Sequence, residues 1–272
     1  MLKFPIERIV CLTEETVETI YLLNEQDKIV GVTGYAVRPT IVRKEKTRVS
    51  SFISAKIEKI LALKPDIVFT FSDIQADVSK QLISQGLNVF CFNQRSIDEV
   101  FSMIRILGQL LDCSKKADYL VNDLKKNLEQ IKSKSFQNKF KPRIYFEEWD
   151  DPLITGINWV SELIEVAGGE DIFSSLGKNS KAKNRVVTKE QVLNENPDII
   201  ISSWCGKKIS FDKIICRKNW HQIKAVKNKQ IYEIKSPVIL QPGPAALTEG
   251  VKQIEKIINN WLRDVMNDQS KT

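Results

Sequence analysis

Residues 57–68 read IEKILALKPDIV, and residues 189–200 read KEQVLNENPDII. Glu, Leu, Pro and Asp recur in the second stretch at a constant distance of 132 residues, as Pro65 and Pro197 illustrate. In each stretch a short helical pattern stops before the proline, because proline disfavours helical backbone at the residue that precedes it. An apolar run typical of a buried strand then follows Pro-Asp. The repeat predicts two similar lobes, each containing one such unit.

Short β-branched and aromatic runs alternate with helical patterns along the whole chain. These runs are continuously apolar, which is typical of strands that are buried on both faces of a parallel sheet. The predicted strands are residues 9–12, 29–32, 67–71, 89–92, 143–146, 199–202 and 230–234. The alternation predicts an α/β fold made of two Rossmann-like lobes with mainly parallel sheets.

One long helix is predicted between the two groups of strands, at about residues 114–135. Its apolar positions form a single stripe, with lysines and acids elsewhere. At 1.5 Å per residue such a helix spans roughly 33 Å, which suits a rigid bridge between lobes. We therefore divide the chain into an N-terminal lobe at residues 1–112, a connecting helix at residues 113–136 and a C-terminal lobe at residues 137–272.

The composition argues against several classes of partner. The chain of 272 residues carries 41 Lys and Arg against 34 Asp and Glu, but its lysines are spread through many segments. Nucleic-acid binding would favour a clustered basic stripe, so we expect no nucleic-acid partner. We also expect a monomer. The chain is not expected to span a membrane, because no apolar run is long enough to cross a bilayer.

Cysteine and histidine usage limits the chemistry of the chain. The five cysteines show no CxxC spacing, and His221 is the single histidine. We therefore expect reduced thiols. We expect neither a zinc knuckle nor a metal site made of several histidines. The N-terminal sequence MLKFPIERIVCL lacks the pattern of a signal peptide. The chain as written is expected in the cytoplasm, or outside it if a leader precedes the sequence.

Several motifs, in their order along the chain, resemble the solute-binding proteins that serve ABC importers of cobalamin, haem and iron-siderophores. They are RIVCLTEETVETIYLL, KIVGVTGYAVRP, IEKILALKPDIVFTF, DPLITGINWVSELIEVAGGEDIF, EQVLNENPDIII and SPVILQPGPAALTEGVKQIEKII. The resemblance covers nearly the whole chain and is strongest to the cobalamin-binding members.

This resemblance implies two α/β lobes bridged by a rigid helix, with a small-molecule ligand held between the lobes. It implies no catalysis and no covalently bound cofactor, and the expected ligand is cobalamin or a related metal chelate. An ABC permease dimer is the partner that the resemblance implies.

Candidate ligand-binding residues follow the predicted strands, because ligands of open parallel sheets bind beyond the carboxyl ends of the strands. They are Tyr35, Arg38, Phe71, Trp149, Trp204, Lys207 and Gln241. Aromatic side chains would form walls for a flat ligand, and Arg38 and Lys207 could meet its carboxylates or phosphate. The alternative for each aromatic residue is packing in the core at a strand end.

Two positions depart from the cobalamin-binding members of the resembling family. Phe71 stands where those proteins have tryptophan, and Asn184 stands near the place of a second tryptophan. The resemblance therefore leaves the identity of the ligand open.

Glu58 and Glu190 occupy equivalent places in the two repeats. In the resembling family one glutamate per lobe docks onto arginines of the permease, and these two residues match them. The alternative is that both are first-turn glutamates that stabilise the helix dipole.

Two further functions stay open from the sequence. One is a cytoplasmic carrier or sensor of a corrinoid or another metabolite, which has the same fold but no permease. The other is an enzyme that uses Cys205 with His221 or an acid, since lysines beside Cys205 would favour its thiolate.

Overall fold

The computed structural model describes residues 4–51, 54–179 and 181–269. The chain divides into two compact units. The first runs to Gln94 and includes Asp98–Leu124, and the second comprises Arg95–Ile97 and the residues from Lys125 onward. The helix predicted at residues 114–135 is present as α6 (Ser114–Ser135), and the boundary between the units falls within it. The sequence-based division had treated this helix as a separate segment.

The described residues of the first unit form a parallel sheet with the strand order β3-β2-β1-β4-β5. Its strands are β1 (Ile9–Cys11), β2 (Ile29–Thr33), β3 (Arg48–Ser50), β4 (Ile67–Phe71) and β5 (Val89–Phe92). The order reverses direction between β1 and β4, so the loops after these two strands diverge at one edge of the sheet. The four predicted strands of this unit are confirmed, and β3 was missed because its sequence, RVS, holds a single apolar residue and no apolar run.

Helices follow the strands of the first unit in sequence. They are α1 (Glu14–Leu22), η1 (Gln26–Lys28), α2 (Val42–Glu45), α3 (Ile57–Ala62), η2 (Asp73–Gln75), α4 (Ala76–Ser84) and α5 (Ile97–Leu110). One buried cluster joins Val10 and Val68 of the sheet to Ile60 of α3 and to Val78 and Leu82 of α4. This cluster holds α3 and α4 on the sheet.

The second unit has a mixed sheet with the order β10-β9-β6-β7, and β8 pairs with β6. Its strands are β6 (Arg143–Asp150), β7 (Leu153–Thr155), β8 (Glu170–Asp171), β9 (Ile199–Ser202) and β10 (Ile231–Glu233). β7 runs antiparallel to β6, and the other pairings are parallel. Strands β7 and β8 were not predicted from the sequence. The α/β class with mainly parallel sheets is confirmed.

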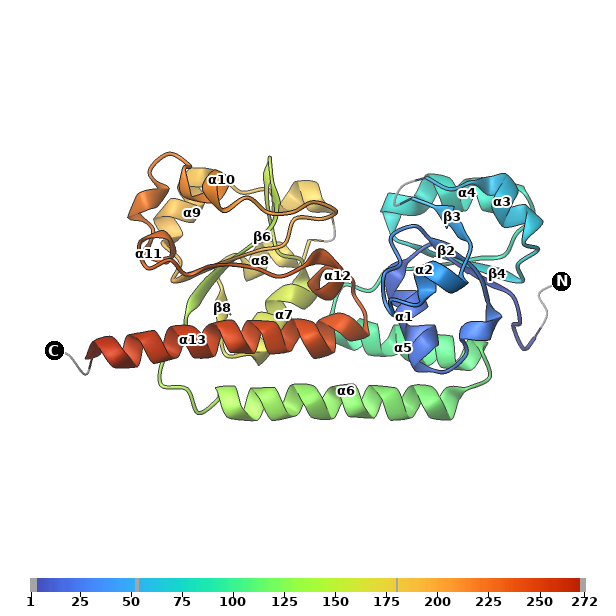
Figure 1. Ribbon diagram of the computed structural model, residues 1–272, viewed down its shortest axis with the longest axis horizontal. Helices are drawn as coiled ribbons and strands as arrows, with labels where there is room; N and C mark the ends of the chain where they lie inside the picture. Colours follow the sequence, from blue (N-terminus) through green and yellow to red (C-terminus); the bar gives the residue numbers. More distant parts are fainter. Residues whose placement is uncertain (1–3, 52–53, 180, 270–272) are drawn as a thin grey trace. The chain divides into compact units, whose positions relative to one another are not determined.

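Helices also surround the second sheet (Figure 1). They are α7 (Asn158–Val166), α8 (Ser174–Gly177), η3 (Ala182–Arg185), α9 (Lys189–Glu195), α10 (Phe211–Ile215), η4 (Trp220–Gln222), α11 (Lys224–Lys227), α12 (Ser236–Ile239), the π-helical η5 (Ala246–Gly250) and α13 (Val251–Gln269). Figure 1 shows the long α13 beside α7, which it contacts.

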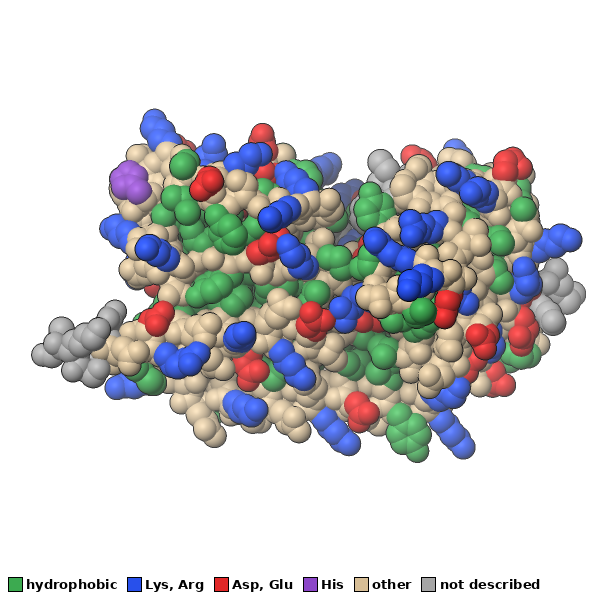
Figure 2. Space-filling model, in the orientation of Figure 1, with side chains coloured by type: hydrophobic (Ala, Val, Ile, Leu, Met, Phe, Trp, Pro, Cys, Tyr) green, Lys and Arg blue, Asp and Glu red, His purple; other side chains and the backbone are tan. Residues whose placement is uncertain are grey.

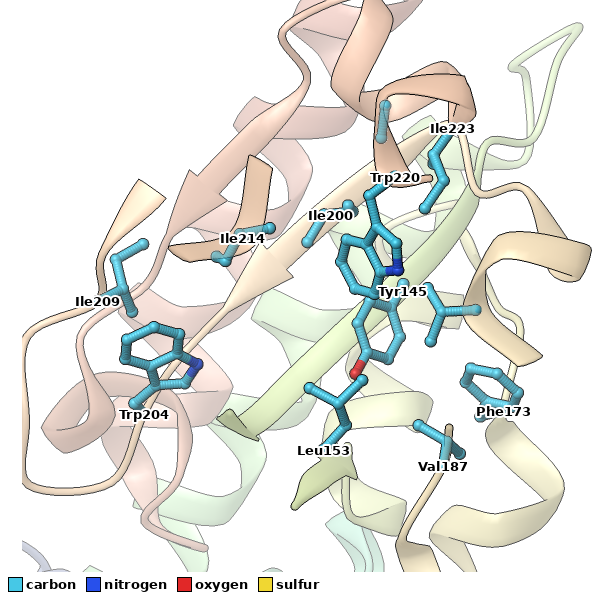
Figure 3. Packing of buried hydrophobic residues seen from close by; sticks show 12 residues of the cluster. Tyr145, Leu153, Phe173, Val187, Ile200, Trp204, Ile209, Ile214, Trp220 and Ile223 are labelled. Atoms are coloured by element: carbon cyan, nitrogen blue, oxygen red, sulfur yellow. The ribbon is translucent and has the colours of Figure 1, made fainter. Parts of the chain in front are cut away.

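The core of the second unit is rich in aromatic side chains (Figure 3). Tyr145 of β6 lies edge-on to Phe173 and Trp220, with ring centroids 5.9 and 6.2 Å away. Both tryptophans of this cluster, Trp204 and Trp220, are almost completely buried.

The two sequence repeats fold into equivalent corners. Lys64 and Asn196, the residues before Pro65 and Pro197, both adopt left-handed backbone with φ of 46°. After each proline an aspartate accepts a backbone hydrogen bond from an arginine at the start of a neighbouring strand segment: Asp66 from Arg8 at 2.9 Å, and Asp198 from Arg143 at 3.0 Å. The repeat therefore reflects one structural unit used twice.

Figure 2 shows lysine and arginine side chains scattered over the visible face, with acids between them. Within the part of the chain that the structure describes, no helix is both long enough and apolar enough to cross a membrane.

Candidate functional site

The first unit presents three of the predicted site residues after its strands. Tyr35 follows β2 and is 44% exposed. Phe71 ends β4 and is half-buried. The third residue, Arg38, is half-buried and forms an ion pair with Glu18 of α1 at 2.9 Å. The guanidinium of Arg38 is therefore already neutralised by the protein.

Two glutamates that follow β1, Glu14 and Glu15, were missed by the sequence reasoning. Glu14 and Glu15 open α1, and Glu15 is 2% exposed. Burial, reinforced by the charges of Glu15 and Glu18, raises the pKa of Glu14 to about 8. Burial raises the pKa of Glu15 to about 7, although hydrogen bonds with Thr13 and Gln94 oppose the shift. Burial therefore favours the protonated form of both carboxyl groups.

Strand β6 ends in a row of acids that are paired by cations from distant segments. Glu147 is fully buried and receives two hydrogen bonds from the guanidinium of Arg217, one of them at 2.9 Å. The neighbouring Glu148 is paired with Arg185, which also donates to the backbone oxygen of Thr155. These pairs anchor the segments around η3 and η4 to the sheet.

Lys207, Trp149 and Trp204 are brought together at the same strand end. The Lys207 ammonium lies 4.0 Å from the ring centroid of Trp149 and 4.9 Å from that of Trp204. It also donates a hydrogen bond to Asp150 Oδ1. Lys207 thus closes a small cage made of two indole rings and one carboxylate.

This geometry corrects the expectation for Trp204. Trp204 was expected to offer an open aromatic face, but it is 2% exposed and packs beside Ile209 in the core (Figure 3). Its indole N–H donates to Glu147 at 2.9 Å, and this buried acceptor draws the ring inward. Lys207 is paired with Asp150, and its expected contact with an anionic group of the ligand stays a prediction.

Trp149 and Gln241 remain partly accessible in the second unit. Trp149 lies in β6, and its indole N–H donates to the backbone oxygen of Asp151 at 2.9 Å. Gln241 follows α12. Asn184, which the sequence analysis placed near the position of a tryptophan in the resembling proteins, is exposed in η3.

The two glutamates expected to dock a permease are both exposed. Glu58 lies in the first turn of α3, and Glu190 lies in the first turn of α9. Exposure fits both the docking role and the helix-dipole role, so the docking role stays a prediction.

Cys205 and His221 are exposed, on the loop after β9 and on η4 respectively. Among the described residues, no group of three or more His, Cys, Asp or Glu side chains is arranged to hold a metal ion. The catalytic role considered for Cys205 stays untested.

The site residues that the sequence reasoning missed differ in the strength of their sequence signal. The acids of YFEEWD in β6 could have been noticed, because charged residues are costly inside a buried strand and require partners. Their partners Arg185 and Arg217 carry no local signal, since each lies tens of residues away in sequence.

Known proteins resemble the chain over most of its length. An uncharacterized ABC transporter substrate-binding lipoprotein of Bacillus subtilis is 31% identical, with 93% of this chain and 80% of that protein covered. A vitamin B12-binding protein of Vibrio parahaemolyticus is 25% identical, with 92% and 89% covered.

A solved structure described as a possible iron-binding, periplasmic solute-binding protein from Staphylococcus epidermidis has the same fold. It matches with a TM-score of 0.79 and 26% identity, over 93% of this chain and 99% of that one. The model of the periplasmic binding protein family matches residues 9–238. The chain therefore belongs to the periplasmic binding protein family.

Proposed function

We propose that this protein is the substrate-binding component of an ABC importer and that it binds a corrinoid or a related flat metal chelate. The observation that carries the proposal is the placement of Tyr35, Phe71 and Trp149 at the carboxyl ends of strands in the two units. Aromatic faces at these positions suit a large, flat and partly apolar ligand. The vitamin B12-binding relative supports the same ligand class.

The charge pattern favours a ligand with a neutral, amide-bearing periphery over a dicarboxylate such as haem. Arg38 is paired with Glu18, and Lys207 is paired with Asp150. A ligand carboxylate would have to compete with these internal carboxylates for the same cations.

A titration with cyanocobalamin and with hemin, followed by intrinsic fluorescence, tests this proposal. Replacing Tyr35 or Trp149 with alanine should weaken the binding free energy of the chelate by about 1–3 kcal/mol, which is the scale of a lost aromatic contact. Tyr119→Ala is the matched control, because Tyr119 is 72% exposed on α6 and does not follow a strand. Wild-type affinity in Tyr35→Ala and Trp149→Ala would contradict the proposal.

The importer role predicts a permease that docks on Glu58 and Glu190. Reversing both charges in Glu58→Lys/Glu190→Lys should abolish capture of the permease and leave ligand affinity unchanged, because like charges across an interface cost several kcal/mol. Glu129→Lys on α6, also exposed, is the control for a change of net charge. Undiminished capture would remove these glutamates from docking.

The importer role also implies an extracytoplasmic location. A cytoplasmic carrier or sensor of the same fold is the alternative, and it would bind the chelate without any permease. Fractionation of cells that produce the protein from its natural gene separates the two, since recovery in the cytoplasm contradicts the importer role.

A further inference from the structure

The cage around Lys207 has the composition of a recognition site for an organic ammonium ion. Two indole faces lie 4.0 and 4.9 Å from the charged nitrogen, within the distance of about 6 Å at which cation–π attraction is significant. A carboxylate oxygen of Asp150 accepts one ammonium proton. Aromatic cages bind quaternary ammonium and methyl-lysine groups through such cation–π contacts. A carboxylate adds a charged hydrogen-bond acceptor for an ammonium that carries protons.

The walls of this cage are held by contacts that do not involve Lys207. The indole N–H of Trp204 donates to Glu147, and Glu147 is in turn held by Arg217. The indole N–H of Trp149 donates to the backbone of Asp151. Both rings therefore use their edges for hydrogen bonds and leave their faces for the cation.

The occupant, by contrast, reaches the cage from an exposed loop. Four consecutive residues of this loop are exposed: Cys205, Gly206, Lys207 and Lys208. Gly206 has a φ of 73°, and a Cβ added to it would meet no atom within 4 Å. The Lys207 side chain is 38% exposed, whereas that of Asp150 is 8% exposed. Lys207 therefore enters the cage from the solvent side, whereas the carboxylate of Asp150 is part of the buried wall of the cage.

We infer that Trp149, Trp204 and Asp150 form an alkylammonium-binding site that Lys207 of the same chain occupies. A primary or secondary ammonium group of a small ligand would make the same contacts after displacing Lys207. The loop that carries Lys207 would then be released from the end of β6. This inference goes beyond the proposed chelate binding and does not depend on it.

Chemical rescue tests the inference directly. In Lys207→Ala the missing atoms of the side chain correspond to propylammonium. This ion should bind the variant at least tenfold more tightly than the wild type, which is about 1.4 kcal/mol. Binding is measured by the change in tryptophan fluorescence, and 1-propanol is the neutral control probe. Equal binding by the variant and the wild type, or equal binding of propanol, would overturn the inference.

Two further variants assign the effect to the cage. Asp150→Asn/Lys207→Ala should lose the added affinity, because the amide cannot neutralise the ammonium. Lys208→Ala should bind propylammonium as the wild type does, because Lys208 is the exposed neighbour on the same loop. Retained affinity in the first variant, or a gain in the second, would contradict the site.

The wild-type protein offers a test that requires no substitution. An ammonium held by Asp150 and two rings should react slowly with an acetylating reagent, so we expect Lys207 to be acetylated at least fivefold more slowly than Lys208. Added propylammonium should bring the rate at Lys207 closer to that at Lys208. Equal rates at the two lysines without the added ion would show that the cage does not hold Lys207.

Discussion

At the scale of single residues, the backbone of Lys64 and Asn196 shows how the two repeats turn from helix to strand. Both residues have a φ of 46°, a left-handed conformation that costs an L-residue about 1–2 kcal/mol unless its side chain compensates. Asn196 compensates, because its side-chain oxygen accepts a hydrogen bond from the Lys224 backbone at 2.9 Å. Lys64 is exposed, and its side chain has no amide oxygen that could accept a bond of the kind that Asn196 accepts.

This difference predicts opposite effects of glycine at the two corners. Lys64→Gly should increase the free energy of unfolding by about 0.5–1 kcal/mol, since glycine adopts left-handed backbone without steric cost. Asn196→Gly should lower it by about 1 kcal/mol, because the bond to Lys224 is lost. Urea unfolding measures both values. A loss of stability in Lys64→Gly would show that its backbone is not strained.

The carboxyl group of Glu15 predicts a pH dependence of stability. Its pKa is raised from 4.5 to about 7 in the folded protein, so the folded state keeps a proton that the unfolded state has released. The unfolded state binds fewer protons in this window, and stability therefore falls as the pH rises from about 4.5 to about 7. Glu15→Gln removes this loss and should be more stable than the wild type at pH 8 by about 1–3 kcal/mol.

Thermal unfolding of Glu15→Gln and the wild type at pH 5 and pH 8 measures this difference. Glu7→Gln is the matched control, because Glu7 is exposed. An advantage of Glu15→Gln that is the same at both pH values would contradict the role of ionisation.

At the scale of elements, β6 has an apolar half and a charged half along its eight residues. Its first half, with Tyr145 and Phe146 fully buried, packs in the core. Its second half carries Glu147, Glu148 and Asp150, which receive cations from three different segments. The strand therefore orders the loops around its carboxyl end.

The buried pair between Glu147 and Arg217 predicts a specific pattern of stabilities. Glu147→Gln should lower the free energy of unfolding by about 3–5 kcal/mol, because it leaves the guanidinium without a countercharge in the core. The double variant Glu147→Leu/Arg217→Met removes both charges and should be less destabilised than Glu147→Gln. Chemical denaturation of the two variants checks the order. A double variant less stable than Glu147→Gln would mean that packing, and not charge, dominates here.

At the scale of the whole molecule, each unit has its own sheet and its own set of strand ends. Tyr35 belongs to the first unit and Trp149 to the second. Under the proposed chelate binding, saturating cyanocobalamin should slow amide hydrogen exchange at the strand ends that carry these residues. Exchange measured by mass spectrometry tests this, and unchanged exchange at both strand ends would contradict the proposal.

Local patterns in the sequence were sufficient for much of the fold. The apolar runs at residues 67–71 and 199–202 became β4 and β9, and the single apolar stripe at residues 114–135 became α6. These features depend on neighbours within a few residues, so periodicity and a Pro-Asp corner identify them. The placement of Tyr35 just after β2 and of Phe71 at the end of β4 followed from the same patterns.

The sequence by itself thus determined the α/β class, the two repeated units and the strand ends at which a ligand is expected. The tertiary structure decided which of those residues are accessible and how they are charged. Trp204 became a core residue through Glu147, and Glu147 is held by Arg217, which lies 70 residues along the chain. Lys207 became the occupant of its own cage through Asp150, at a separation of 57 residues. Hydrophobic periodicity is local, whereas the partners that satisfy a buried charge are chosen across the fold, where only packing brings them together.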